Sequence, residues 1–283
     1  MEHFRLRRSL LFVPGDRPDR IKKSITLDTD VVVIDLEDAV APEQKAAARQ
    51  SVKQALEEVE FGQKECVVRI NSILTLNGIR DLAAFKDFGR HPDTVIAPKV
   101  ESAEEVQILG SLLEEINPAI GIIVVLESAK GILAAREIAM ASPKVNGVIF
   151  GGGDLSGDIG CPMTWEPLLG ARQLVVLAAA AAKVDAIDVP FLDLEDMHGL
   201  EEETRRIASM GYAGKAVIHP KQIETVNRIF SPGESDVAWA RRVLEAVKQS
   251  GQGAIRVDGK MVDAAVVKRA EKIAQTARRV GSV

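Results

Sequence analysis

Two acidic residues follow separate apolar runs of the chain and could together bind a divalent cation. Glu127 comes directly after the run Ile120–Leu126. Asp154 follows the run Val145–Phe150 and three glycines, of which Gly153 is the last. Two carboxylates suit Mg²⁺, which takes oxygen ligands and keeps positions open for water and an anionic substrate. We therefore predict a Mg²⁺ site at Glu127 and Asp154, with a salt-bridged surface pair as the alternative. Gly153 could present its N–H group to a substrate carboxylate.

The ends of two other apolar runs carry groups that could complete such a site. Glu37 and Asp38 follow the run Val31–Leu36, where they could hold the waters of the cation and contact the substrate. Arg69 lies near the end of the run Cys66–Ile70. Its guanidinium could bind a carboxylate or a developing enolate oxygen through two hydrogen bonds.

Lys99 follows a further run, Thr94–Pro98, and admits two interpretations. A lysine in this position could form a Schiff base with a carbonyl substrate. More often such a lysine pairs with neighbouring acids, here Glu101 or Glu37. The abundance of acids after the other runs favours ion pairing and a metal-dependent reaction.

The elements that must position these residues are short apolar runs at regular spacing. Each run is rich in Val and Ile and nearly continuous, which is typical of strands buried on both faces of a parallel sheet. Segments with helical period lie between the runs, and eight such units within about 230 residues favour an α/β fold of the (β/α)8 TIM barrel type over a doubly wound open sheet. The predicted strands are Ser9–Val13, Val31–Leu36, Cys66–Ile70, Thr94–Pro98, Ile120–Leu126, Val145–Phe150, Ala186–Phe191 and Lys215–Ile218. The predicted helices are Pro42–Val59, Ser102–Glu115, Lys130–Ala141, Pro167–Ala182, Leu200–Met210 and Pro220–Ile229.

The chain after the eighth unit has a different pattern. Ser231-Pro232-Gly233 interrupts the chain, so we predict a barrel domain over residues 1–230 and a C-terminal helical lid extension over residues 231–283. The extension could cap the barrel, cover a site or pack on a neighbouring subunit. Its predicted elements are a helix over Ser235–Gln249, a flexible joint at Gly251–Gly253, a hairpin over Ala254–Met261 and a helix over Val262–Arg279.

The composition argues against several classes of protein. The chain has 36 Lys and Arg against 41 Asp and Glu, and this net charge of −5 argues against a dedicated nucleic-acid binder. Cys66 and Cys161 are far apart and form no zinc pattern, which indicates reduced thiols. The apolar stretch Leu174–Ala182 is about half as long as a membrane span. We expect a soluble, cytoplasmic protein. The glycine-rich segment has Ser156 where a dinucleotide-binding motif has its third glycine.

Eight segments in chain order resemble the citrate lyase beta subunit-like family of acyl-CoA lyases, within the wider group of metal-dependent HpcH-type aldolases. The resemblance extends over nearly the whole chain. The set in this order is specific, although each segment alone is weak. The segments are SLLFVPGDRPDR, VVVIDLEDAV, VVRIN, APKVESAEEV, VVLESAKGIL, GVIFGGGDLSGDIG, KAVIHPKQI and GKMVD.

This resemblance implies roles for individual residues. It implies a (β/α)8 barrel, Mg²⁺ at Glu127 and Asp154, and substrate binding by Arg69. The aspartate of the family's tail, thought to act as an acid and base, falls on Asp263, which would close over the site of an adjacent protomer in a homotrimer or hexamer. Asp263 also precedes an apolar helical segment, and its simpler interpretation is a helix N-cap. Residues near the first strand would meet the coenzyme A phosphates, and Arg17, Arg20, Lys22 and Lys23 are placed to do so.

The implied reaction is a retro-Claisen cleavage of a 3-hydroxy-3-carboxyacyl-CoA thioester. The substrate would be (S)-citramalyl-CoA or malyl-CoA, and the products acetyl-CoA with pyruvate or glyoxylate. Four alternatives stay open. They are a malyl-CoA thioesterase, a citrate lyase beta subunit that acts on an acyl carrier, an aldolase that acts on free hydroxy-oxo acids, and a non-catalytic barrel subunit.

Overall fold

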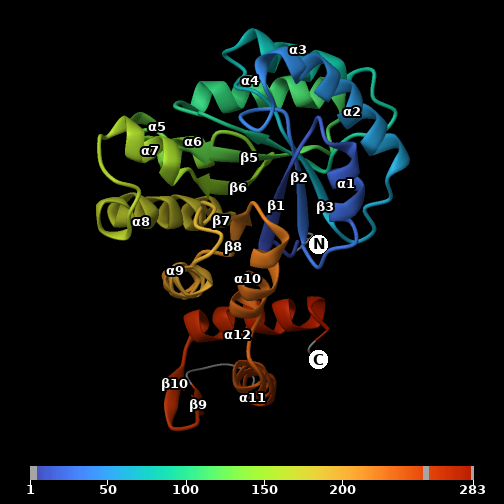
Figure 1. The fold of residues 1–283 in the computed structure, drawn as a ribbon. Coiled ribbons are helices and arrows are strands. Elements are labelled where there is room, and N and C mark those ends of the chain that lie inside the picture. The colour runs from blue at the N-terminus through green and yellow to red at the C-terminus, as the bar shows by residue number, and fades with distance from the viewer. Residues whose placement is uncertain (1–4, 251–254, 282–283) are drawn as a thin grey trace. The chain divides into compact units, whose positions relative to one another are not determined.

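The computed structural model describes residues 5–250 and 255–281, and it contains a closed barrel of eight parallel strands (Figure 1). The strands pair in chain order, and the first also pairs with the eighth, which closes the barrel. All eight overlap the runs predicted from the sequence. They are β1 (Ser9–Pro14), β2 (Val31–Asp35), β3 (Glu65–Arg69), β4 (Thr94–Ala97), β5 (Gly121–Leu126), β6 (Val145–Phe150), β7 (Asp185–Asp188) and β8 (Gly214–Val217).

Side chains that alternate along each strand fill the interior of the barrel. Val31 and Val33 of β2 belong to this inner core, whereas Val32 and Ile34 are equally buried without belonging to it. Because successive side chains of a strand point to opposite faces, the second pair faces the helices. Burial on both faces explains why the runs are continuous rather than alternating. The inner core consists of Leu10, Val31, Val33, Val67, Ile96, Ile123, Val125, Ile149 and Ile187.

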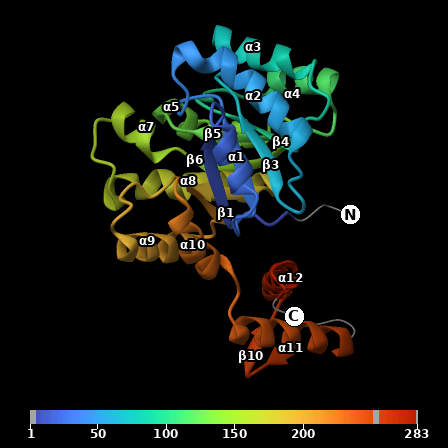
Figure 2. The ribbon, with the colours of Figure 1, turned by 45° about the vertical axis from the view of Figure 1, so that its right-hand side comes forward.

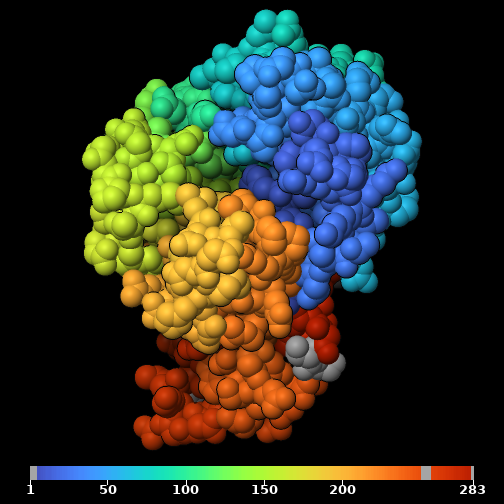
Figure 3. Space-filling view, in the orientation of Figure 1, coloured from blue at the N-terminus to red at the C-terminus, as the bar shows by residue number. Residues whose placement is uncertain are grey.

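Helices surround the barrel and cover the outer faces of its strands (Figure 2). Figure 3 shows the surface that results, in the orientation of Figure 1. The first six are α1 (Pro18–Ser24), α2 (Lys45–Glu58), α3 (Leu76–Phe85), α4 (Ala103–Ile116), α5 (Ala129–Leu133) and α6 (Ala135–Ala139). The next four are α7 (Gly152–Asp158), α8 (Trp165–Ala182), α9 (Met197–Met210) and α10 (Ile223–Phe230). Two 3₁₀ turns, η1 (Pro42–Gln44) and η2 (Pro220–Gln222), precede α2 and α10. No helix among the described residues is both long and apolar enough to cross a membrane.

The helical layer departs from the sequence prediction in two ways. The single helix predicted over Lys130–Ala141 is wrong, because Ala134 has φ −94° and ψ 12° and divides the segment into α5 and α6. Three short helices, α1, α3 and α7, were not expected. The sequence gives little indication of two of these helices. Helix α1 begins with Pro18 among charged residues, and α7 begins inside the glycine run at Gly152.

The chain divides into two compact units, one of which is Arg7–Asn227, and the chain from Arg228 onward belongs to the other. This division lies three residues before the predicted boundary at 230/231. The second unit contains α11 (Glu234–Ser250), a hairpin of β9 (Ile255–Val257) and β10 (Lys260–Val262), and α12 (Ala264–Arg279). The predicted joint at Gly251–Gly253 lies outside the described residues. The core of this unit is formed by Ala240, Val243, Val262 and Ala270.

Candidate active site

The carboxyl ends of β2 to β6 bring charged side chains to one mouth of the barrel. These ends lie together because the strands are parallel and closed into a ring. Burial, together with the negative charges of Glu37 and Asp154, raises the pKa of Glu127 to about 7. Such coupling requires that the three carboxylates lie near one another. We call the following residues the mouth cluster: Asp35, Glu37, Asp38, Arg69, Lys99, Glu127 and Asp154.

Arg69, the last residue of β3, is held by two carboxylates. Its Nε and Nη2 donate to Asp35 Oδ1 and Oδ2 at 2.7 and 2.6 Å, which is a bidentate pair. Its Nη1 lies 2.9 Å from Glu37 Oε2 in an ion pair. The Phe12 ring lies 5.2 Å from the guanidinium carbon. The sequence predicted Arg69 at this mouth, but it did not predict Asp35 as the residue that fixes its orientation.

Glu127 is fixed by the backbone around it. The N–H group of Lys99 donates to Glu127 Oε1 at 2.6 Å. A Cβ atom on Gly151 would lie 2.3 Å from the Cβ atom of Glu127, which real Cβ atoms do not tolerate. Gly151 is therefore the glycine that this geometry requires. The role of Gly153 in substrate binding stays a prediction, since the nearest atom to an added Cβ there is Met163 Sδ at 4.0 Å.

Asp154 lies in the first turn of α7, directly after the glycines. The same helix is joined to the loop of Glu127, because Asp158 Oδ2 accepts a hydrogen bond from the N–H group of Ala129 at 2.7 Å. The loops that carry Glu127 and Asp154 are thus connected at two points, by this bond and by the contact at Gly151.

Lys99 and the two residues after β2 complete the mouth cluster. Lys99 Nζ donates to Glu37 Oε1 at 2.6 Å and lies 3.4 Å from Asp38 Oδ1, so the expected pairing with Glu37 is confirmed. Glu101 pairs instead with Lys130 at 3.3 Å. Burial raises the pKa of the Glu37 carboxyl. Lys99 also has φ 55°, a left-handed conformation that costs a residue with a side chain about 1–3 kcal/mol.

The donor set of the mouth cluster fits Mg²⁺. Glu127 and Asp154 offer hard carboxylate oxygens, and their mutual repulsion would be relieved by a divalent cation between them. Among the described residues no three His, Cys, Asp or Glu side chains are grouped so that they could hold a metal ion. Two protein ligands would leave the remaining coordination positions to water and substrate. Glu37 and Asp38 form ion pairs with Lys99. Their predicted contact with the waters of the cation stays a prediction.

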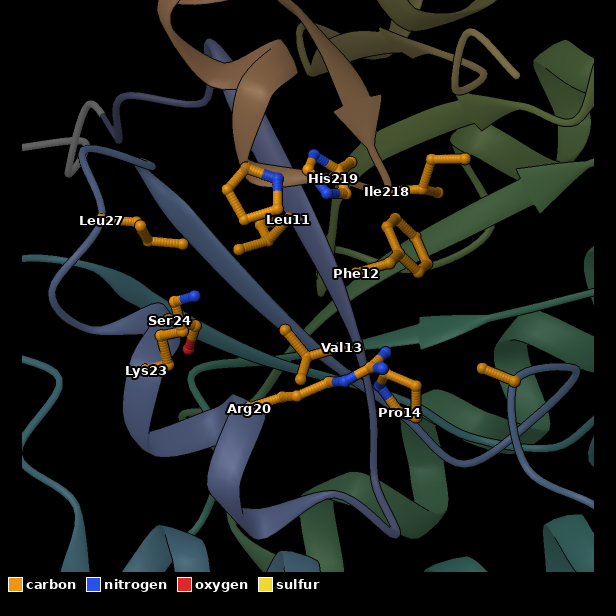
Figure 4. A pocket seen from close by; sticks show the side chains of 12 residues that line it. Leu11, Phe12, Val13, Pro14, Arg20, Lys23, Ser24, Leu27, Ile218 and His219 are labelled. Atoms are coloured by element: carbon orange, nitrogen blue, oxygen red, sulfur yellow. The ribbon is translucent and has the colours of Figure 1, made fainter. Parts of the chain in front are cut away.

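A pocket of about 520 Å³ lies against β1 and α1 (Figure 4). Phe12 forms part of its wall and is the same ring that lies beside Arg69, so the pocket adjoins the mouth cluster. The lining is largely apolar. Arg20 and Lys23 of α1 lie on one side and Ile218 and His219 on the other (Figure 4). The sequence did not predict Phe12 or His219, because their proximity depends on the pairing of β1 with β8.

The basic residues predicted to meet coenzyme A separate into two pairs. Arg20 and Lys23 line the pocket. Arg17 instead donates to Asp19 at 3.0 and 2.8 Å, in an exposed pair. Lys22 is exposed, and its Nζ lies 3.9 Å from Glu58 Oε2. The structure therefore does not place the side chains of Arg17 and Lys22 on the pocket wall.

Asp263 lies in the second unit and precedes α12 directly. Its Oδ1 accepts hydrogen bonds from the N–H groups of Ala265 and Val266, both at 3.0 Å. The simpler interpretation of this residue, a helix N-cap, is confirmed. The carboxylate is exposed, and its role as an acid and base stays a prediction.

Comparison with known proteins decides the family. Residues 8–220 match the model of the family described as HpcH/HpaI aldolase/citrate lyase. The chain belongs to the HpcH/HpaI aldolase/citrate lyase family. Residues 171–282 also match a family described as C–C bond lyase of the TIM-barrel fold. The resemblance inferred from the sequence segments and the predicted barrel are both confirmed.

Relatives in this family are similar over almost their full length. The chain is 36% identical to citrate lyase subunit beta of Leuconostoc mesenteroides subsp. cremoris, over 98% of this chain and 95% of that protein. It is 34% identical to L-malyl-CoA/beta-methylmalyl-CoA lyase of Cereibacter sphaeroides, and the match covers 97% of this chain and 96% of that protein. It is 35% identical to the mitochondrial citramalyl-CoA lyase of Homo sapiens, over 94% and 84%. The chain is accordingly a carbon–carbon lyase of the HpcH/HpaI family.

Solved structures of the HpcH/HpaI family share the barrel. The protein CitE of Mycobacterium tuberculosis, in complex with magnesium, acetoacetate and coenzyme A, has a TM-score of 0.77 and 36% sequence identity. The match covers 95% of this chain and 97% of that one. Magnesium is thus present in a similar structure.

Proposed function

We propose that this lyase is Mg²⁺-dependent and cleaves a 3-hydroxy-3-carboxyacyl-CoA thioester, (S)-citramalyl-CoA or malyl-CoA, to acetyl-CoA and a 2-oxo acid. One observation carries the proposal: the coupled carboxylates of Glu127 and Asp154 share a mouth with Arg69, and a pocket with two basic side chains adjoins it. A cation site beside an apolar pocket with two basic side chains suits a small hydroxy-carboxylate joined to a coenzyme A arm. The names of the relatives support this substrate class.

Each group of the chain would have a distinct task. When bound by Glu127 and Asp154, Mg²⁺ would supply Lewis-acid polarisation of the substrate's hydroxyl and carboxylate oxygens. Arg69, held rigid by Asp35, would stabilise the negative charge of the thioester enolate. Arg20 and Lys23 would bind the phosphates of coenzyme A, and the apolar wall at Phe12 would pack against its arm.

Cleavage would begin at the 3-hydroxyl of the substrate. The 3-hydroxyl loses its proton to water, and its oxygen becomes the carbonyl of the 2-oxo acid. The bond between carbons 2 and 3 breaks, and its electron pair moves into the thioester enolate. Asp263, which we propose comes from a neighbouring subunit of a trimer or hexamer, would transfer a proton to the enolate carbon and so form acetyl-CoA. The proton that the hydroxyl released to water would replace the one that Asp263 transfers.

Product analysis tests the reaction. The protein is incubated with (S)-citramalyl-CoA, malyl-CoA and citryl-CoA, with Mg²⁺ or with EDTA, and the products are identified by mass spectrometry. The proposal expects acetyl-CoA and pyruvate or glyoxylate, formed with Mg²⁺ and not with EDTA. Free coenzyme A with citramalate or malate would instead indicate a thioesterase. Absence of turnover on every coenzyme A ester would contradict the proposal. It would favour an acyl carrier substrate or a non-catalytic barrel.

Mixing two inactive variants tests the role of Asp263. Arg69→Ala and Asp263→Asn each remove one half of the proposed site. If Asp263 acts in the site of its neighbour, mixed oligomers contain some intact sites, and activity returns after the two proteins are mixed under subunit-exchange conditions. Exchange is checked by native mass spectrometry. Exchange without any return of activity would contradict a shared site.

A further inference from the structure

Lys99 connects three loops of the mouth cluster through two different groups. Its backbone N–H donates to Glu127 after β5, and its ammonium donates to Glu37 after β2. Both distances are 2.6 Å. The left-handed conformation of Lys99, with φ 55°, lets one residue reach both acids.

Glu37 is a third carboxylate beside the proposed cation site, since Lys99 contacts both Glu37 and Glu127. Each of its oxygens is opposed by a cation, since Lys99 Nζ lies 2.6 Å from Oε1 and Arg69 Nη1 lies 2.9 Å from Oε2. A carboxylate without these partners would compete for a nearby divalent cation, because Mg²⁺ accepts several oxygen ligands. In the part of the chain that the structure describes, Glu37 is not grouped with Glu127 and Asp154 as a third ligand.

We propose that Lys99 is a positioning residue that holds Glu37 away from the cation and so keeps coordination positions open for the anionic substrate. This inference rests on the cation site under the proposed function. Loss of the ammonium would act in two opposite directions. The mouth would become more negative and would bind Mg²⁺ more tightly. An anionic 2-oxo acid would bind more weakly, because the mouth would repel it and the cation would have fewer open coordination positions.

Two variants separate the side chain of Lys99 from its backbone. Lys99→Met removes the ammonium and keeps a side chain in the left-handed conformation. Lys99→Gly removes the ammonium too, but glycine adopts this conformation without strain and keeps the N–H group that Glu127 accepts from. If Lys99→Met does not fold, Lys99→Gly still tests the proposal. Lys99→Arg keeps the positive charge.

Isothermal titration calorimetry with Mg²⁺, and then with pyruvate in the presence of saturating Mg²⁺, measures both effects. For Lys99→Met and Lys99→Gly we expect the Kd for Mg²⁺ to fall about tenfold, since the lost cation is partly screened by solvent, and the Kd for pyruvate to rise about tenfold. The double variant Lys99→Gly with Glu37→Gln restores the Mg²⁺ affinity of the wild type. Lys99→Arg stays near the wild type in both titrations.

The matched control is Lys130→Met, because Lys130 also pairs with an acid near the same end of the barrel, Glu101, and does not contact Glu37. It is expected to change neither affinity by more than about twofold, as for an exposed pair. Weaker binding of both Mg²⁺ and pyruvate by Lys99→Gly would show a merely structural role and overturn the inference, as would unchanged affinities. A wild-type protein that binds no Mg²⁺ would overturn the proposed function itself, which is a distinct outcome.

Discussion

Two groups of charged side chains in the barrel unit differ in charge balance. In the mouth cluster, two cations, Arg69 and Lys99, face five carboxylates. The second group, which we call the β7–β8 network, consists of Arg172, Asp188, Glu203 and Lys215, two cations and two carboxylates. The first group has a formal excess of three negative charges and the second has none.

The charged side chains of the β7–β8 network pair with one another. Lys215 Nζ donates to Asp188 Oδ2 at 2.6 Å and to Glu203 Oε1 at 2.7 Å. Arg172 Nε donates to Asp188 Oδ1 at 3.0 Å. The side chains of Lys215 and Asp188 are fully buried, between the barrel and the helices α8 and α9. Balanced, buried charges connect elements of the fold, whereas an excess of carboxylates at an accessible mouth suits a cation.

Removal of one acid from the mouth cluster should reduce activity, whereas removal of one acid from the β7–β8 network should reduce stability. We expect Glu127→Gln and Asp154→Asn to lower kcat/KM for the proposed Mg²⁺-dependent cleavage by about 10³-fold or more, because each removes a proposed cation ligand. Neither should lower the midpoint of thermal unfolding, because each relieves repulsion at the mouth. Steady-state kinetics and thermal melts of the same samples test both statements. Loss of folding in either variant would contradict the comparison.

Asp188→Asn should have the opposite profile. It leaves Lys215 and Arg172 without their shared carboxylate in a buried place, so we expect a loss of about 3–5 kcal/mol in the free energy of unfolding. Urea titrations measure this loss. Glu201→Gln is the control, because Glu201 accepts from Arg205 in a pair within the surface of α9. A loss of less than about 1 kcal/mol in Asp188→Asn, as at a surface pair, would remove the distinction.

Gly151→Ala tests the support of the mouth cluster. The new methyl group would overlap the Cβ atom of Glu127, so Glu127 must move and we expect Mg²⁺ affinity to fall about tenfold. Gly157→Ala in the neighbouring helix α7 is the matched control, since no atom lies within 4 Å of its added Cβ. Calorimetric titration with Mg²⁺ compares the two. Equal affinities in both variants would mean that Glu127 is not held as described.

The smallest expected effect concerns the pocket. Lys23→Met and Arg20→Met should each raise KM for the thioester by about three- to tenfold and leave kcat nearly unchanged, because they act on a part of the substrate far from the broken bond. Lys22→Met, one residue from Lys23 and directed to Glu58, should leave KM unchanged. If Lys22→Met had the larger effect, the coenzyme A arm would not follow this pocket.

The sequence predicted much of the barrel because its strands are buried on both faces. Arg69, Glu127 and Asp154 could be predicted at the mouth, since each lies at or just after the carboxyl end of a predicted strand. Which acid holds Arg69 could not be predicted, because the second run contains Asp35 and is followed directly by Glu37 and Asp38. The pocket depends on the closure of β1 against β8, and no local pattern encodes that pairing. Asp263 was identified by resemblance alone.

A crystal structure of the protein soaked with Mn²⁺ and pyruvate, with the anomalous signal of Mn²⁺ used to locate the cation, tests the central claim most directly. Our account predicts one cation at the mouth, bound by oxygens of Glu127 and Asp154, with pyruvate in the positions that the protein leaves open and Glu37 still paired with Lys99. A cation bound elsewhere, or a mouth without a cation at saturating Mn²⁺, would contradict it.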